Sequence, residues 1–255
     1  WPTETALLRD LVAIPSISGS EEEAARFVEA EARRLGLDVI RDETAVKVYV
    51  ESGEGPTLAL ISHLDVVPPG DGWTRDPFTP VIEGDRLYGR GSGDAKASVV
   101  AMLLAAKDAA DRGAVRHGRL VAVFGYGEET KHTSMPAALA TVGAVDYAVV
   151  GEPTNLEISV AQRGLMVVDL VARGDQRHAG YASQGDFTNA IQALAANLVK
   201  LDGIVAERVH PVLGVTTVTP TMVEAGVRRN RPPPSARAIL DVRTTPPLTH
   251  EGLSA

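Results

Sequence analysis

Apolar and polar positions alternate between helical and extended patterns over the first third of the chain. Residues 3–11 and the segment that begins at Ser20-Glu21-Glu22-Glu23 carry apolar residues at helical spacing, and Gly36 is expected to end the second helix. Three short runs rich in β-branched residues predict strands, at residues 37–40, 46–50 and 58–62. The third run leads directly into His63.

A long segment rich in proline, glycine and aspartate follows, over residues 64–93, and predicts an ordered loop with a short hairpin at Gly84-Asp85. An alanine-rich helix is then expected from Asp94 to Asp111. The pattern continues with a strand at 120–124, a helix at 135–139 and a strand at 145–150. This alternation predicts an α/β fold with three layers around a mostly parallel sheet.

The pattern changes near residue 160, which predicts two domains, residues 1–160 and residues 161–255. The second domain is expected to be a smaller α+β unit with strands at 165–172, 212–224 and 236–242 and a helix at 189–201. Thr249 and Glu251 indicate the start of a helix close to the end of the chain. A helix that begins there and stops after a few residues predicts a truncated chain, and with it a truncated second domain.

Composition narrows the possible functions. The 25 basic and 33 acidic residues give a net charge of −8 without a basic block, so nucleic acid is not expected as a partner. Hydrophobic residues reach 44% but aromatic ones only 4%, which predicts an aliphatic core, and no apolar run of about 18 residues indicates a membrane span. The sequence has no cysteine and does not begin with a signal-like segment, which predicts a cytoplasmic protein. A mature secreted chain whose signal was removed would have the same pattern at this end.

Four clusters of acidic residues or histidine stand where predicted strands end. They are Ser62-His63-Leu64-Asp65, Gly91-Ser92-Gly93-Asp94-Ala95-Lys96, Gly127-Glu128-Glu129-Thr130 and Gly151-Glu152-Pro153-Thr154. Each cluster alone is more often a hydrogen-bonded surface pair, a solvated helix start or a turn. Ligands of open α/β sheets bind beyond the carboxyl ends of the strands, so the four clusters together predict one crevice. Without cysteine, a metal there would be held by histidine and carboxylates.

The order and the residues of these clusters resemble the motifs of a two-zinc metallopeptidase and deacylase family. That family includes acetylornithine deacetylase, succinyl-diaminopimelate desuccinylase, aminoacylase and carboxypeptidase G. Further matching segments are Trp73, Asp76-Pro77-Phe78 and Leu87-Tyr88-Gly89-Arg90-Gly91. The resemblance covers nearly the whole chain. It implies a metal-binding catalytic domain over residues 1–160 and a lid or dimerisation domain over residues 161–255.

The resemblance also implies individual roles. His63 would bind one metal, Asp94 would bridge two, Glu152 would complete the first site and Glu129 would serve the second. Asp65 would orient the imidazole of His63, as an outer carboxylate does for many metal-bound histidines. Glu128, beside a ligand, would act as the general base that activates water. The implied ions are divalent, with zinc preferred and cobalt as an alternative.

In the second domain, Arg177-His178-Ala179-Gly180 resembles the family's lid segment. The resemblance assigns His178 to the oxyanion in the active site of a partner subunit, and so implies a homodimer. It places Arg163, Asn230 and Arg243 where the family holds the substrate carboxylate. Without the resemblance, each of these side chains is more often an ordinary surface or capping residue.

One departure concerns the last metal ligand of the family, a histidine that follows the lid domain. The sequence stops before that region, so the second metal would lack a ligand. His210 and His250 fall within the lid-like segment and are not expected to substitute. His132 is nearer the site, but a loop or helix-surface role is expected for it. Ala97, where a glycine is common in the family, is a smaller departure.

The expected function is hydrolysis of the amide bond of an N-acyl amino acid, with an N-acetyl or N-succinyl basic amino acid as substrate. Within the family, the resemblance is nearer to the acetylornithine deacetylases, on the motifs Glu128-Glu129-Thr130 and Gly151-Glu152-Pro153-Thr154. A dipeptidase or carboxypeptidase with the same metals is the alternative enzyme. A metal-binding but catalytically silent protein is the alternative from another class. Glu128 beside Glu129 argues against a purely structural module.

Overall fold

The computed structural model describes residues 2–130, 133–182, 185–201 and 209–246. The chain forms two compact units, residues 1–157 and residues 158–255. None of the described helices combines the length and the apolarity that crossing a membrane requires. Thr249 and Glu251, where a helix start is expected, lie outside the described residues.

The first unit is built around a five-stranded sheet with the order β1-β2-β6-β3-β7. The strands are β1 (Asp38–Arg41), β2 (Ala45–Ser52), β3 (Thr57–His63), β6 (Gly118–Gly125) and β7 (Tyr147–Val150). β3 pairs in parallel with β6 and β7, whereas β1 pairs antiparallel with β2 and β2 antiparallel with β6. The α/β class is confirmed, and the sheet is mixed where the sequence predicts a mostly parallel one. The short link over residues 42–44 explains this, since such a link permits only an antiparallel hairpin.

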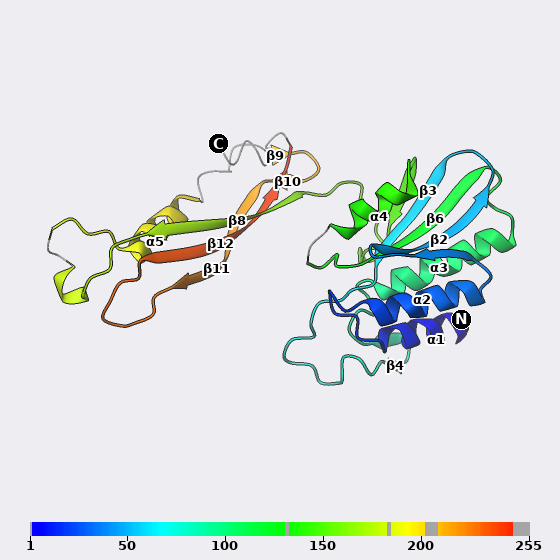
Figure 1. The fold of residues 1–255 in the computed structure, drawn as a ribbon, viewed down its shortest axis with the longest axis horizontal. Helices are drawn as coiled ribbons and strands as arrows, with labels where there is room; N and C mark the ends of the chain where they lie inside the picture. The colour runs from blue at the N-terminus through cyan, green and yellow to red at the C-terminus, as the bar shows by residue number, and fades with distance from the viewer. Residues whose placement is uncertain (1, 131–132, 183–184, 202–208, 247–255) are drawn as a thin grey trace. The chain divides into compact units, whose positions relative to one another are not determined.

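Helices cover both faces of this sheet and give the three layers that the sequence predicts (Figure 1). The helices are α1 (Pro2–Val12), α2 (Glu22–Arg34), α3 (Lys96–Asp111) and α4 (Ser134–Val142). α1, α2 and α3 share one hydrophobic cluster with the sheet, and α4 packs in a second cluster on the opposite face. α2, α3 and α4 bury their apolar sides against strands and α1 packs on α2 and α3, so tertiary packing stabilises them.

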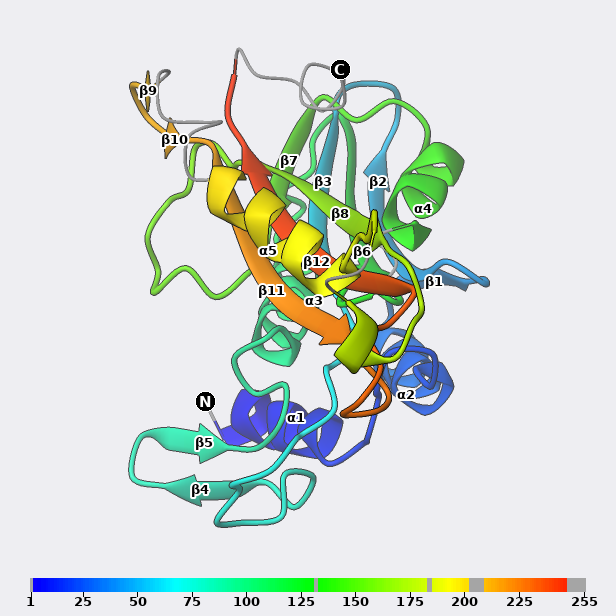
Figure 2. The ribbon, with the colours of Figure 1, turned by 90° about the vertical axis from the view of Figure 1, so that its left-hand side faces the viewer.

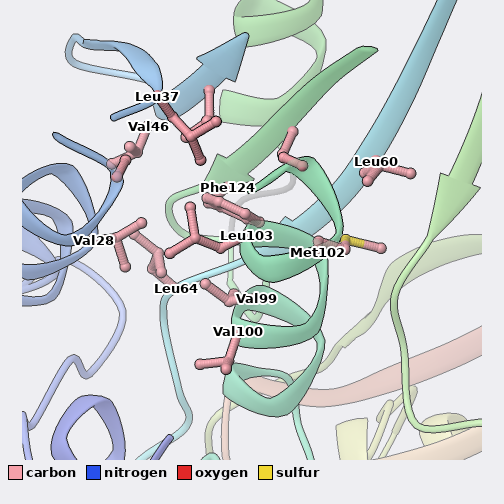
Figure 3. Close-up of a cluster of buried hydrophobic side chains, with 14 of the residues drawn as sticks. Val28, Leu37, Val46, Leu60, Leu64, Val99, Val100, Met102, Leu103 and Phe124 are labelled. Carbon is pink, nitrogen blue, oxygen red and sulfur yellow. The ribbon is translucent and has the colours of Figure 1, made fainter. Parts of the chain in front are cut away.

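Strand periodicity sorts the side chains of the sheet between the two clusters. Phe124 and Ala122 of β6 face the side of α3, whereas Val121 and Val123 face the side of α4. Figure 3 shows Phe124 among aliphatic side chains that include Leu103 of α3. Phe124 is the one aromatic residue among the fully buried core side chains of the described chain, so the core is aliphatic, as the composition predicts.

The long loop between β3 and α3 contains the expected hairpin. β4 (Val81–Glu83) pairs antiparallel with β5 (Arg86–Tyr88). Gly84 opens the two-residue turn with a φ of 62°, a backbone conformation that glycine adopts without the steric cost of a Cβ. The dipeptide Gly84-Asp85 therefore marks the turn correctly.

The second unit contains a three-stranded antiparallel sheet with the order β11-β12-β8. Its elements are β8 (Gly164–Arg173), η1 (Ala179–Tyr181), α5 (Ala190–Lys200), β9 (Val209–His210), β10 (Gly214–Val215), β11 (Thr217–Ala225) and β12 (Ser235–Thr244). α5 lies along the sheet in Figure 2 and shares a core with β8 and β12. Asn189 caps this helix, because its Oδ1 accepts hydrogen bonds from the amides of Ile191 and Gln192.

The single strand expected over residues 212–224 is wrong in its first part. The chain makes a β9–β10 hairpin before β11 begins at Thr217. Nδ1 of His210 accepts hydrogen bonds from the amides of Val212 and Leu213 at 3.2 and 3.1 Å, and Gly214 has a φ of 73°. These contacts bend the chain where the apolar pattern alone predicts extension.

Candidate metal centre

Three neighbouring parallel strands, β6, β3 and β7, carry the predicted ligands at their carboxyl ends. His63 is the last residue of β3, Glu129 follows β6 and Glu152 follows β7. Asp94 lies two residues before α3. Because parallel strands end at the same edge of a sheet, His63, Glu129 and Glu152 are brought to one place. The loop that leads into α3 brings Asp94 to the same place, where it contacts His63.

The distances between the side chains fit a metal site. One donor atom each from His63, Asp94 and Glu129 lie within 4.8 Å of one another. Nε2 of His63 lies 3.2 Å from Oδ1 of Asp94 and 3.8 Å from Oε1 of Glu152. Two ligand atoms on one tetrahedral zinc ion are about 3.3 Å apart. One imidazole with several carboxylates is a donor set that suits zinc and other first-row divalent ions.

The imidazole of His63 is buried and contacts Asp65 through Nδ1. Its side chain is 1% exposed, and Nδ1 lies 2.9 Å from the backbone oxygen of Asp65 and 3.4 Å from the Oδ1 carboxylate atom of the same residue. Burial acts to lower the pKa of His63, but the carboxylate of Asp65 and the charges of Glu152 and Glu128 outweigh it and raise that pKa to about 9. Nδ1 faces Asp65, and Nε2 is the nitrogen that faces the carboxylates of Asp94 and Glu152.

Asp65 connects the imidazole to the loop that carries the two glutamates. Its Oδ1 accepts a hydrogen bond from the amide of Glu128 at 3.0 Å, and its Oδ2 accepts from the amide of Glu129 at 3.0 Å and from Oγ of Ser18 at 2.7 Å. Burial opposes ionisation, yet the hydrogen bonds lower the pKa of Asp65 to about 2. The carboxylate is therefore ionised at neutral pH, and it contacts both the imidazole of His63 and the loop of Glu128 and Glu129.

The remaining carboxylates repel one another. Burial and the charge of Asp94 raise the pKa of Glu129, with further contributions from Glu128 and Asp65. Burial likewise raises the pKa of Glu152, and the charges of Asp94, Glu128 and Glu129 add to the effect, against the lowering effect of His63. The charge of Glu128 also contributes to the pKa shifts of three members of the cluster, His63, Glu129 and Glu152. Such crowding of acidic groups is relieved by a bound cation.

The backbone around Asp94 is fixed by close packing. Gly91 has a φ of 85°, and a Cβ at this position would lie 2.6 Å from Cγ1 of Val66. Lys96, fully buried, donates hydrogen bonds from Nζ to the carbonyl oxygens of Leu11 and Ile14 at 3.1 and 2.7 Å. The segment that presents Asp94 is thus held against the strand segment that follows His63 and against the end of α1.

The predicted residues of the second unit, or their direct neighbours, make contacts within that unit. The amide of Ala179, next to His178, donates to the backbone oxygen of Asn230 at 3.0 Å, so these two segments are neighbours. Nε of Arg163 donates to the carbonyl oxygen of Leu213 at 2.9 Å. Arg243 forms an ion pair with Asp241, with Nε and Oδ1 2.8 Å apart. Their assignment to substrate binding stays a prediction.

The other histidines considered from the sequence do not add a ligand among the described residues. His210 uses Nδ1 to cap the turn of the β9–β10 hairpin. His132 and His250 lie outside the described residues.

The sequence reasoning missed Ser18 and Glu21, which contact this site from the segment before α2. Ser20 and the glutamates after it predict a helix cap, but the N-cap residue is Glu21 and its side chain makes no capping bond. The pattern Ser16-Ile17-Ser18-Gly19 with Glu21, polar yet adjacent to apolar helices, is the signal that could have indicated a packed loop.

An α/β fold with a histidine and carboxylates gathered at the carboxyl ends of parallel strands defines a class of metal-binding α/β proteins. A family model described as peptidase family M20/M25/M40 matches residues 59–233, and the chain belongs to this family. The resemblance derived from the sequence is thereby confirmed.

Individual relatives agree with this assignment. Succinyl-diaminopimelate desuccinylase of Gluconobacter oxydans is 32% identical over 218 residues, 79% of this chain and 57% of that protein. An M20 family metallo-carboxypeptidase from Sulfolobus solfataricus superposes with a TM-score of 0.72 at 21% identity, over 96% of this chain and 71% of that one. A dinuclear metal-binding M20 peptidase of Bacillus subtilis gives a TM-score of 0.70 at 16% identity, over 99% and 66% of the two chains. The chain spans 57% and 59% of the length of two curated relatives.

Proposed function

We propose that this protein hydrolyses the amide bond of an N-acyl amino acid with the help of divalent metal ions. The observation that carries the proposal is the approach of His63, Asp94 and Glu129, whose donor atoms lie within 4.8 Å of one another. Membership of the M20/M25/M40 family supports it, as does the desuccinylase among the relatives.

In the proposed arrangement His63, Asp94 and Glu152 hold one ion, and Asp94 and Glu129 contribute to a second. The Bacillus subtilis relative is described as a dinuclear metal-binding peptidase, which supports a centre with two ions. Zinc is the preferred ion and cobalt the alternative, because imidazole and carboxylate ligands suit both. When bound, two such ions polarise an amide carbonyl and lower the pKa of water from about 15.7 towards 7.

Glu128 is the proposed general base. Its carboxylate takes a proton from the attacking water and delivers it to the nitrogen of the leaving amine, so that the amide yields a carboxylate and an amine. The amide of Glu128 donates to Oδ1 of Asp65 at 3.0 Å, which fixes the backbone that carries the proposed base. Asp65 also orients His63, so one buried carboxylate aligns the ligand and the base.

The proposed substrate is an N-acetyl or N-succinyl basic amino acid. Arg163, Asn230 and Arg243 are proposed to hold its carboxylate, since arginine binds carboxylates bidentately. His178 is proposed to stabilise the oxyanion in the active site of a second subunit, which requires a homodimer through the second unit. The cytoplasmic location stays a prediction.

A dipeptidase or carboxypeptidase activity is the second candidate. The carboxypeptidase from Sulfolobus solfataricus and the human carnosine dipeptidase share the fold, with TM-scores of 0.72 and 0.68. The same proposed base and ligands would cleave a peptide bond, because a peptide is also a linear amide. A chain that binds metal without turnover is the third candidate, since the second ion has fewer proposed ligands than the first.

The test combines metal binding with hydrolysis of three substrates: N-acetylornithine, N-succinyl-diaminopimelate and a dipeptide. Each is assayed with the metal-free chain and after addition of zinc or cobalt. The proposal predicts metal-dependent cleavage of an acyl amino acid that falls at least about 100-fold in Glu128→Gln. Glu54→Gln is the control, because Glu54 is exposed and lies between β2 and β3, at the end of β3 away from His63.

Cleavage of the dipeptide alone would establish the second candidate. Bound metal without cleavage of any substrate would leave the chain as a metal-binding protein, and cleavage that Glu128→Gln does not affect would exclude the proposed base.

A further inference from the structure

The segment between α1 and α2 is attached to the strand end that carries His63. Ile17 and Val66 form a parallel bridge, the amide of Ser18 donates to the oxygen of Val66 at 3.2 Å, and the amide of Val66 donates to the oxygen of Ser16 at 2.9 Å. Oγ of Ser16, fully buried, donates to the oxygen of Leu64 at 2.6 Å. Residues 16–18 therefore lie alongside residues 64–66, next to the candidate metal centre.

Two side chains of this segment reach the loop of Glu128 and Glu129. Oγ of Ser18 donates to Oδ2 of Asp65 at 2.7 Å, and the same oxygen accepts from the amide of Glu129 at 3.0 Å. Oε1 of Glu21 accepts from the amide of Gly127 at 3.1 Å and from the amide of Gly19 at 2.8 Å. Glu21 thus joins its own loop to the residue that precedes Glu128.

The position of Glu21 suggests a different role from the one that carboxylates usually have there. A glutamate at a helix start commonly interacts with the first free amides of the helix. Glu21 is the N-cap residue of α2 but makes no side-chain capping bond, and it is only 9% exposed. Burial of a carboxylate costs free energy that hydrogen bonds must offset. Here the bonds go to two loops, not to the helix.

Together, two buried carboxylates fix three successive amides. Glu21 accepts from Gly127, and Asp65 accepts from Glu128 and Glu129. Gly127 has a φ of 65°, so the chain turns sharply at this point. With all three amides held, the direction in which the side chains of Glu128 and Glu129 leave the backbone is fixed as well.

We propose that Glu21, assisted by Ser18, is a positioning residue that holds the Glu128–Glu129 loop in register with His63 and Asp94. The inference rests on the proposed function for the roles of Glu128 and Glu129. This role requires a side-chain oxygen at position 21 that accepts hydrogen bonds, because both partners of Glu21 are backbone amides. Glutamine keeps an oxygen acceptor at the same place and alanine does not.

The test compares wild type with Glu21→Ala, Glu21→Gln and Glu23→Ala. Glu23 is an exposed glutamate in the first turn of the same helix and serves as the matched control. Cobalt affinity is measured by the visible spectrum during titration of the metal-free chain, and amide exchange of residues 127–129 is followed by mass spectrometry or NMR. Loss of an outer partner of a metal ligand typically weakens binding about 10–100-fold.

Glu21→Ala is expected to weaken cobalt binding by about 10–100-fold and to accelerate exchange at residues 127–129. Glu21→Gln is expected to restore both to within about threefold of wild type, and Glu23→Ala to match wild type. Wild-type affinity and exchange in a folded Glu21→Ala variant would overturn the inference. Equal damage by glutamine and alanine would also overturn it, because the acceptor would then not be the required property.

A second variant keeps the test decisive if Glu21→Ala does not fold. Ser18→Ala removes one hydroxyl and leaves Asp65 its two amide donors, so a loss of cobalt affinity of up to about tenfold is expected. No loss in a folded Ser18→Ala variant would overturn the role of the segment. A wild-type chain that binds no cobalt would contradict the proposed function, while the exchange rates would still decide the positioning role.

Discussion

At the scale of single residues, the site depends on a few buried polar groups more than on the ligands alone. Asp65 is fully buried, yet its pKa is lowered to about 2 because hydrogen bonds with His63, Ser18, Glu129 and Glu128 outweigh its burial, so the carboxylate is ionised at neutral pH. A ligand cluster of like charges needs such a frame, since its members repel one another in the absence of a cation.

The first prediction concerns Asp65→Asn. The amide that replaces one carboxylate oxygen is a donor, so it cannot accept from a backbone amide, and one of the two loop contacts is lost. Zinc affinity should fall about 10–100-fold by competition with a chromophoric chelator. Asp85→Asn, in the exposed turn of the β4–β5 hairpin, should retain wild-type affinity. Unchanged affinity in Asp65→Asn would show that the carboxylate has no part in aligning the ligands.

A second prediction concerns a buried pair away from the metal centre. Lys47, 2% exposed in its side chain, forms an ion pair with Asp42, 27% exposed. Although burial opposes it, the hydrogen bonds from Lys47, Thr44 and Ala45 hold the pKa of Asp42 well below its usual value. Asp42→Asn leaves the ammonium without its charge partner and should lower the free energy of unfolding by about 2–3 kcal/mol at pH 7.

The pH dependence of the stability difference between wild type and Asp42→Asn follows from the direction of the pKa shift of Asp42. The folded pKa of Asp42 is lower than the unfolded one, so the stabilisation is complete above the unfolded value, near 3.8, and is lost as the pH falls below it. The stability difference between wild type and Asp42→Asn, measured by urea denaturation, should shrink by about 1 kcal/mol between pH 5 and pH 3. A difference that is constant over this range would contradict the assigned ion pair.

At the scale of elements, the two helices that flank the Asp94 segment are coupled by one side chain. Lys96 begins α3, and its ammonium binds the carbonyl oxygens of Leu11 and Ile14 at the end of α1. The last carbonyl groups of a helix have no partners within the helix, and a cation there also interacts favourably with the helix dipole. This contact links the N-terminal helix to the segment that presents Asp94.

Lys96→Met should therefore destabilise the protein. Methionine fills a similar volume but removes the ammonium donor from the carbonyl oxygen of Ile14 and leaves that of Leu11 only the amide of Ile14, which we expect to lower the free energy of unfolding by about 2 kcal/mol. Lys107→Met, on the same helix and more exposed, should change stability by less than about 0.5 kcal/mol. If Lys96→Met proved as stable as wild type, the cost of burying the ammonium would equal the value of its hydrogen bonds.

The elements were largely predictable from the sequence, but their pairing was not. Apolar runs and glycine positions mark β2, β3 and β6, because local periodicity reflects burial. That β6 lies between β2 and β3 depends on long-range contacts that no local pattern carries. The β9–β10 hairpin was missed for a related reason, since the side chain of His210 determines the turn.

The same distinction holds for the site. His63, Asp94 and Glu129 stand in short motifs at strand or loop ends, and the structure brings them together. Glu21 stands in a segment that looks like a simple helix start. Its contact with Gly127 joins residues 106 positions apart in the sequence, so local spacing could not indicate it.

At the scale of the whole molecule, the proposed ligands and the groups that support them belong to the first unit. His63, Asp94, Glu129 and Glu152, together with Asp65, fall within residues 1–157. The proposed substrate contacts fall in the second unit. This division predicts that metal binding and substrate binding can be separated by dissecting the chain.

Residues 1–157 expressed alone should fold and bind zinc within about tenfold of the affinity of the whole chain, as measured by calorimetry, because each proposed ligand keeps its partners. Circular dichroism would establish that the fragment is folded. A folded fragment that does not bind zinc would show that the second unit supplies a ligand or an essential support.

The most direct test of the central claim is the zinc content of the chain after gel filtration, determined by elemental analysis for wild type and for Asp94→Asn. Asp94 is proposed to contact both ions, so wild type should retain one ion tightly and a second more weakly, and Asp94→Asn should lose both. Asp71→Asn, in the exposed part of the long loop, should retain the wild-type content. Wild type without zinc, or Asp94→Asn with undiminished zinc, would contradict the assignment of this cluster as a metal centre.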